Sequence, residues 1–184
     1  MTTKTLERYD RIAGAFTRRV EAVPADAWDA PAPCEGWVAR DVVGHLVEWM
    51  PSLIESGWGV TVPPHPTVDD DPVAAWAAVD AAIRRWLADP ALATREADIF
   101  PGRYSFEQAV DTFCTGDLLV HTWDLARATG LDEMLDPDEV HRMFEAMQPM
   151  DEVLRASGHY GPRVPVAADA DEQTKLIAFT GRRP

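Results

Sequence analysis

Residues 106–129 read FEQAVDTFCTGDLLVHTWDLARAT, the longest stretch of the chain with an uninterrupted helical pattern. Ser105 in front of it is a favourable N-cap, and Gly130 behind it is the residue type that commonly ends a helix. At 100° per residue, the apolar side chains of this stretch gather on one arc. The same arc carries three polar residues: Asp117, His121 and Asp124. We predict one continuous helix over 106–129 with polar side chains on its core face.

Apolar residues spaced three and four apart predict further amphipathic helices on both sides of this stretch. They cover about 4–22, 38–56, 72–88 and 137–157, with a short final helix over 171–179. Pro149 removes a backbone donor and is expected to kink or split the helix that contains it. Strand signals are almost absent. The expected fold class is therefore all-α, a four-helix bundle with an additional C-terminal helix and an extended tail.

The chain of 184 residues is long enough for one domain with a sizeable apolar core. We expect a single domain over 1–184, with its core at about 4–157 and the tail of 158–184 packed on it. The formal net charge of −14 argues against nucleic acid and anionic membranes as partners, because both attract clustered Lys and Arg. Two cysteines do not make a disulfide scaffold. No basic leader and no run of roughly 18 apolar residues occurs, so a cytoplasmic protein is expected.

The polar residues on the core arc need an explanation, because burying an unpaired carboxylate costs several kcal/mol. Asp117 and His121 are four residues apart, so their side chains point to one place on one face of the helix. His45 falls within the apolar arc of the 38–56 helix and could supply a third ligand. Two histidines and one carboxylate leave an open coordination position, as in catalytic zinc sites and in Fe(II) sites. Spacing alone leaves a second interpretation open, in which these are hydrogen-bonded core residues without a metal.

Two segments carry a resemblance to a known family. Residues 33–46 read PCEGWVARDVVGHL, and residues 116–126 read GDLLVHTWDLA. Together they resemble the DinB/YfiT-like metalloprotein superfamily, and in particular the branch formed by the N-terminal domain of mycothiol-dependent maleylpyruvate isomerase. Residues 165–184 are similar to the tail of short actinobacterial-type members of that branch. The resemblance thus covers nearly the whole chain.

The resemblance implies a four-helix bundle that holds a divalent metal, usually zinc and sometimes nickel or iron. In the family, a histidine of the second helix and a carboxylate-x3-histidine pair of a later helix bind the metal, and the matching positions are His45, Asp117 and His121. The resemblance also implies mycothiol as a cosubstrate and a homodimer. Two departures are visible. The isomerase has Glu at the position of Asp117, and it has a second, C-terminal domain to which no part of this sequence corresponds.

Several residues near these ligands are candidates for supporting the site. Asp41 either stabilises the N-terminus of the 38–56 helix or partners the imidazole four residues later. Trp49 is expected to line the pocket, and Trp58 with it. Cys114, one turn before the carboxylate ligand, is expected to pack in the core or to form the pocket floor.

Asp124 and Cys34 each have two interpretations. Asp124 either forms an exposed pair with Arg127 or supports the histidine ligand on the preceding turn. Cys34 precedes the 38–56 helix, whose N-terminus would lower a thiol pKa, but simple packing in a tight turn is favoured. Trp76 and Trp86 are not both expected to be buried within one chain, which favours a dimer.

The expected activity is metal-dependent transfer or isomerisation that uses a low-molecular-weight thiol, mycothiol, on a small electrophile. One alternative is a metal-dependent hydrolase, in which Asp124 or Glu48 would act as the acid or base. Another is a non-catalytic metal-binding or stress-response protein. The Pro-rich loop over 57–70 is expected to border the pocket. His141 and His159 are expected at the surface.

Overall fold

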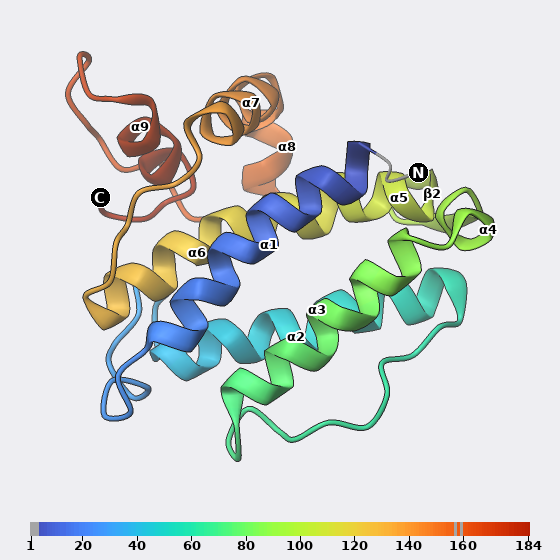
Figure 1. Ribbon diagram of the computed structural model, residues 1–184. Coiled ribbons are helices and arrows are strands. Elements are labelled where there is room, and N and C mark those ends of the chain that lie inside the picture. Colours follow the sequence, from blue (N-terminus) through green and yellow to red (C-terminus); the bar gives the residue numbers. More distant parts are fainter. Residues whose placement is uncertain (1–3, 157, 159) are drawn as a thin grey trace.

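Four helical segments form a closed ring in the computed structural model, which describes residues 4–156, 158 and 160–184 (Figure 1). Around the ring, α1 (Lys4–Ala22) packs against α3 (Pro72–Leu87), α3 against α2 (Ala39–Trp58), α2 against α6 (Thr115–Thr129), and α6 against α1. The apolar side chains that these helices enclose form one core. The all-α, DinB-like bundle expected from the sequence is confirmed.

The expected helix over 106–129 is not continuous. It is divided into α5 (Phe106–Ala109), a π-helical turn η1 (Val110–Cys114) and α6. The amide of Thr115 donates to the carbonyl oxygen of Val110, five residues back, and the Thr115 hydroxyl donates to the same oxygen at 2.9 Å. Such π turns are frequent at functional sites. A pattern read with a period of 3.6 residues does not reveal the wider turn, which is why the sequence predicted one unbroken helix.

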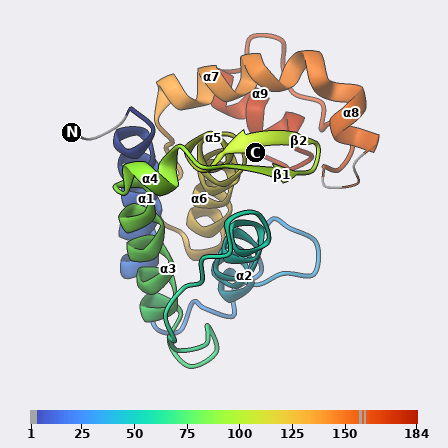
Figure 2. The ribbon, with the colours of Figure 1, turned by 90° about the vertical axis from the view of Figure 1, so that its right-hand side faces the viewer.

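The C-terminal helices cover one side of the ring. Pro149 splits the segment expected at 137–157 into α7 (Pro137–Met147), the 3-10 turn η2 (Gln148–Met150) and α8 (Asp151–Ala156), as its missing donor predicted. The last helix, α9 (Glu172–Phe179), packs against α7. Figures 1 and 2 both place α7, α8 and α9 beyond α6, on the side away from α2.

A short β-hairpin, which the sequence pattern did not indicate, accompanies the helices. After the short helix α4 (Pro90–Ala93), β1 (Glu96–Ile99) pairs antiparallel with β2 (Gly102–Ser105). Each strand has four residues, and Ile99 is the one buried residue in the pair. Alternation of apolar and polar residues needs a longer strand to be recognised, so the pattern carries no strand signal here.

Both tryptophans of α3 are buried within a single chain, which corrects another expectation. Trp76 is 1% exposed and Trp86 is 8% exposed. The Nε1 atom of Trp76 donates to Oγ1 of Thr17 at 2.9 Å, and its ring meets Phe16 edge to face. The aromatic argument for a dimer is therefore wrong, and dimerisation stays a prediction that rests on the family resemblance. Light scattering tests it, since a dimer has twice the mass of one chain.

The loop after α2 covers residues 59–71, because α2 continues to Trp58. Trp58 is 4% exposed and its Nε1 atom donates to the carbonyl oxygen of Arg95 at 2.6 Å, so it is a core residue and not a pocket wall. Arg40 donates to two carbonyl oxygens of the loop, each at 3.1 Å, and holds the loop beside the start of α2. Whether this loop borders a pocket stays a prediction.

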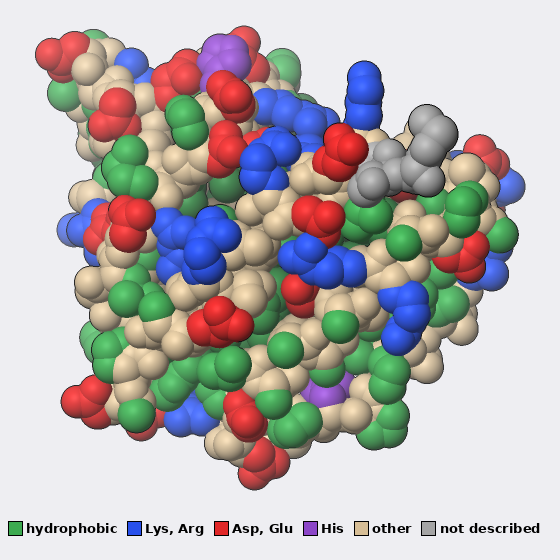
Figure 3. Space-filling view, in the orientation of Figure 1, with side chains coloured by type: hydrophobic (Ala, Val, Ile, Leu, Met, Phe, Trp, Pro, Cys, Tyr) green, Lys and Arg blue, Asp and Glu red, His purple; other side chains and the backbone are tan. Residues whose placement is uncertain are grey.

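Acidic and basic side chains are interspersed over the face shown in Figure 3. The net charge of −14 is therefore not gathered into one acidic patch on that face. Among the described residues, no helix has the length and apolar character that crossing a membrane requires.

Thr115→Val tests the hydrogen bond that closes the π turn. The substitution removes a hydroxyl with no exposed surface and nearly keeps the shape of the side chain. We expect the free energy of unfolding to fall by about 1 kcal/mol, the usual contribution of one buried hydrogen bond, in a chemical denaturation experiment. Ser52→Ala removes an exposed hydroxyl bonded one turn back on α2 and is the control, with an expected change below about 0.5 kcal/mol. Equal stability of Thr115→Val and the wild type would contradict this role.

Candidate metal centre

Three ligand-type side chains converge between α2 and α6. His45 projects from α2, while Asp117 and His121 project from successive turns of α6. The Nε2 atom of His45 lies 3.1 Å from Oδ2 of Asp117, and Nε2 of His121 lies 3.4 Å from Oδ1 of the same carboxylate. One ligand-type atom from each residue lies within 4.8 Å of the others. The structure thus brings together the residues that the sequence singled out, and the metal itself stays a prediction.

The donor atoms of this centre fit a divalent metal ion. Two ligands about 2.1 Å from a tetrahedral ion lie roughly 3.4 Å apart, close to the separations between these side chains. Asp117 is one methylene shorter than the Glu of the isomerase, yet its two oxygens reach both imidazoles. Two histidines and a carboxylate are a known ligand combination of catalytic zinc sites, which leave a further position for solvent or substrate.

The centre is more accessible from one side than from the other. The side chains of His45 and Asp117 are 32% and 27% exposed. The side chain of His121 is only 5% exposed. A small molecule can therefore approach His45 and Asp117 from solvent, while His121 forms the closed side of the centre.

Two tryptophans flank the ligands. Trp49, expected to line the pocket, donates from Nε1 to Oδ2 of Asp117 at 2.8 Å. Trp37 stacks on the ring of His121, with 5.9 Å between centroids and 17° between planes, and lies 5.2 Å from the ring of His45. Helical periodicity does not predict the role of Trp37, because this residue precedes α2 and lies outside any helical pattern.

Asp124 holds the opposite side of the His121 ring. Its Oδ2 atom lies 2.9 Å from Nδ1 of His121, and its side chain has no exposed surface. Arg182, from the segment after α9, donates from Nε to both oxygens of Asp124 at 2.8 and 3.0 Å and from Nη2 to Oδ2 at 2.7 Å. The expected exposed pair with Arg127 is wrong, because Arg127 pairs with Glu133. The contact with His121 agrees with the other interpretation, in which Asp124 supports a ligand.

These charges shift the pKa values of the groups in the centre. Burial lowers the pKa of His121, but the carboxylates of Asp117 and Asp124 outweigh burial and raise this pKa to about 9. Burial raises the pKa of Asp117, but the imidazoles of His121 and His45 hold it well below its usual range. Asp124 also has a lowered pKa, because His121 and Arg182 outweigh its burial. In the metal-free protein at neutral pH, His121 is therefore an imidazolium between two carboxylates.

The surroundings of both cysteines raise the pKa of the thiol and so do not activate it as a nucleophile at neutral pH. Burial and the nearby carboxylate of Asp124 raise the pKa of Cys34 to about 11, against the opposing charge of Arg182. This favours the packing interpretation of Cys34 over activation by the start of α2. Cys114 has no exposed surface, and its burial raises its pKa well above the usual range. Cys114 is therefore a core residue rather than an exposed pocket floor.

Other residues named in the sequence analysis have separate roles. The Oδ2 atom of Asp41 accepts a hydrogen bond from the amide of Val38 at 2.8 Å, so Asp41 caps α2. The alternative, in which Asp41 partners the imidazole one turn later, stays a prediction. His141 is exposed, as expected, and pairs with Glu172. His159 lies outside the described residues.

The tail supplies a residue to the centre that helical spacing did not predict. Arg182 reaches Asp124 from the segment after α9. Tyr160, also in the tail, is partly buried, and its burial and the charge of Asp117 raise its pKa. A single Arg or Tyr far along the chain carries no spacing signal. Only the folded chain reveals these contributions.

The chain belongs to the family described as the mycothiol maleylpyruvate isomerase N-terminal domain, whose profile matches residues 9–126. The matched segment contains His45, Asp117 and His121 and ends before the segment that carries Arg182. The family therefore agrees with the resemblance drawn from the sequence, and it defines a DinB-like, mycothiol-related class of protein.

Two uncharacterized proteins of Mycobacterium tuberculosis, each from a different strain, are similar to this chain over nearly their whole length. Each is 28% identical over 179 residues, which covers 96% of this chain and 97% of the relative. No solved structure matches the chain.

The raised pKa of His121 predicts how the stability of the metal-free protein depends on pH. The folded-state pKa of about 9 lies above the unfolded value of 6.5, so the stabilising contribution is fully present below about pH 6.5 and is lost as pH rises through 9. We expect a loss of up to about 3 kcal/mol between pH 6.5 and 9.5 in denaturation experiments with chelator present. His121→Gln should remove this loss, whereas the control His65→Gln, in the loop after α2, should keep it. The same pH dependence in wild type and His121→Gln would contradict the assignment.

Proposed function

We propose that this chain binds one divalent metal through His45, Asp117 and His121 and uses it to act with mycothiol on a small electrophile. The convergence of these three side chains beside an opening to solvent carries the proposal. Membership of a mycothiol-related family supports this thiol as the cosubstrate. Zinc is the first choice of metal, and nickel or iron also suits imidazole and carboxylate ligands.

Each side chain around the metal ligands has a role that its contacts define. The indole of Trp49 fixes the carboxylate of Asp117 through its Nε1 hydrogen. The carboxylate of Asp124 lies 2.9 Å from Nδ1 of His121, so Nε2 is the nitrogen that faces the centre. Trp37 covers both imidazoles and limits the access of water from that side. When bound, a divalent metal would supply Lewis-acid chemistry that stabilises the thiolate form of a coordinating thiol.

The reacting thiol is expected to come from outside the protein. Cys34 has a pKa of about 11 and Cys114 is fully buried, so neither is a good nucleophile at neutral pH. The exposed edges of His45 and Asp117 give a low-molecular-weight thiol access to the centre. Its thiolate would attack an electrophilic carbon of the second substrate, for group transfer or for cis–trans isomerisation.

The hydrolase alternative has less support from the geometry. A hydrolase of this kind uses an acid or base that can exchange protons with the reacting water. Asp124 has no exposed surface, and Arg182 occupies both of its oxygens. Glu48 is an exposed residue of α2, and Ser52 donates to its backbone carbonyl oxygen rather than to its carboxylate. A non-catalytic metal-binding protein remains the competing outcome of the activity test.

Metal content tests the ligand assignment. We expect close to one zinc per chain in wild type and a loss of most of it in His121→Ala, because two protein ligands seldom retain a catalytic metal. Elemental analysis after loading and desalting measures the content. His141→Ala changes an exposed histidine paired with Glu172 and is the matched control, which should keep its zinc. Equal zinc contents in wild type and His121→Ala would refute the assigned centre.

Mycothiol-dependent conversion of an electrophile tests the activity. We expect the zinc-loaded protein to accelerate the conversion of a small electrophile when mycothiol is present. Loss of free thiol measures group transfer, and the ratio of cis to trans electrophile measures isomerisation. His45→Ala should slow this reaction by at least about 100-fold, equivalent to roughly 2.7 kcal/mol of transition-state stabilisation. Turnover of the electrophile in water without mycothiol would favour the hydrolase. Metal uptake with no turnover in either case would favour a non-catalytic protein.

A further inference from the structure

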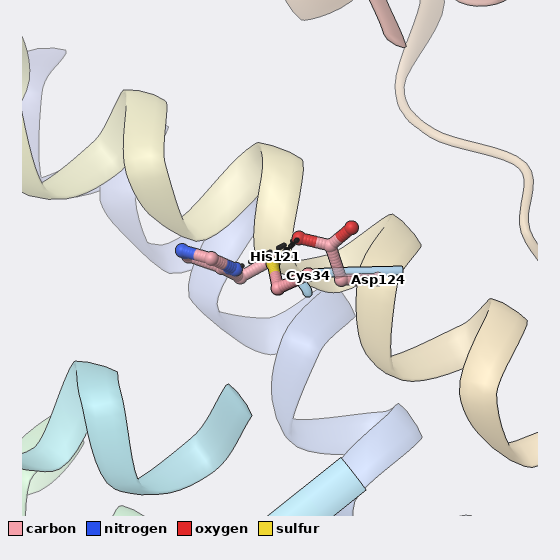
Figure 4. Close-up of side chains that lie close together, drawn as sticks. All are labelled: Cys34, His121 and Asp124. Carbon is pink, nitrogen blue, oxygen red and sulfur yellow. Dashed lines mark hydrogen bonds and ion pairs between the residues drawn. The ribbon is translucent and has the colours of Figure 1, made fainter. Parts of the chain in front are cut away.

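A second group of ligand-type side chains lies on the other side of the His121 ring (Figure 4). Cys34, His121 and Asp124 each offer one atom within 4.8 Å of the others. The Nδ1 atom of His121 and the Sγ atom of Cys34 lie 2.9 and 3.6 Å from Oδ2 of Asp124. Thiolate, imidazole and carboxylate are all ligands of zinc in proteins. The His121 ring therefore stands between two ligand groups, with Nε2 facing Asp117 and Nδ1 facing Asp124.

The second group already contains a cation, the guanidinium of Arg182. Besides its three hydrogen bonds to Asp124, Arg182 places Nη2 at 3.4 Å from the sulfur of Cys34. The side chain of Arg182 is only 13% exposed. The guanidinium of Arg182 and the imidazolium of His121 thus both lie against the carboxylate of Asp124, while the thiol of Cys34 keeps its proton.

The backbone conformation of the tail places Arg182 in this group. Gly181, immediately before it, has a φ of 92°, which favours glycine. A Cβ atom at this position would lie 2.9 Å from the Cα atom of Gly161, so the two chain segments approach too closely for any side chain. The amide of Arg182 donates to the carbonyl oxygen of Ile177, which ties the turn to α9. The position of Arg182 is therefore fixed by the fold rather than by a flexible terminus.

We propose that Cys34, His121 and Asp124 form a latent metal site, one that could bind a metal if Arg182 did not occupy it. By closing this site, Arg182 leaves the Nε2 side of His121 as the metal-binding side. Charge balance supports this. A divalent cation would be neutralised by the carboxylate of Asp124 and the thiolate of Cys34, with the thiol proton and the Nδ1 proton of His121 released to solvent. Arg182 competes with a metal for Asp124, because its guanidinium already donates to both oxygens and its positive charge would repel a divalent cation there. That a metal binds on the Nε2 side of His121 rests on the proposed function. The existence of the latent site on the Nδ1 side does not.

Cobalt(II) titration tests the proposal, because a cobalt–thiolate bond gives a near-ultraviolet charge-transfer band that imidazole and carboxylate ligands do not give. We expect no thiolate band in the wild type and a clear band in Arg182→Gln at one equivalent of cobalt. The band should disappear in the double variant Arg182→Gln with Cys34→Ser. Arg183→Gln removes the neighbouring, exposed arginine and should behave as the wild type. A band in the wild type, or its absence in Arg182→Gln, would overturn the proposal.

A second measurement on the wild type keeps the proposal testable if Arg182→Gln does not fold. Alkylation of Cys34 by iodoacetamide, followed by mass spectrometry, should proceed at the same rate with and without cobalt, because the sulfur is not a ligand. Protection of Cys34 by cobalt would overturn the proposal. Failure of the wild type to bind cobalt at all would instead refute the proposed function, and the band in Arg182→Gln would still decide whether the latent site exists.

Discussion

The carboxylate of Asp124, with no exposed surface in the middle of α6, is the group on which the arrangement of this centre depends. An unpaired charge at such a place destabilises a protein by several kcal/mol, so the fold has to provide positive partners. Arg182 provides one from the tail and the imidazolium of His121 provides the other. The tail after α9 is thus connected electrostatically to the ring of helices.

The two faces of His121 follow from this buried pair. Because Nδ1 lies against Asp124, Nε2 is directed toward Asp117 and His45, where solvent has access. In the metal-free protein a proton at Nε2 satisfies Asp117, and a metal ion would take the same place. Protons and metal are therefore expected to compete for this nitrogen. The surrounding charges that stabilise the imidazolium are also those that would stabilise a bound cation.

Much of the fold could be predicted from periodicity and end signals. The apolar spacing predicted the helices of the ring, and Pro149 correctly predicted the break between α7 and α8. The π turn of Val110–Cys114 and the β-hairpin could not be predicted, because each involves too few residues to produce a period of its own. The burial of both Trp76 and Trp86 depends on which helices surround α3, and spacing along one helix does not contain that information.

Helical spacing alone predicted that His45, Asp117 and His121 lie on core-facing arcs, because it sets the direction of a side chain relative to its own helix. The folded chain was needed to show that Asp117 lies between both imidazoles, that Trp37 lies against them, and that Asp124 pairs with Arg182 rather than Arg127. Hydrogen bonds and ion pairs between distant segments depend on the positions of whole helices. Those positions result from packing across the entire core, which no local pattern records.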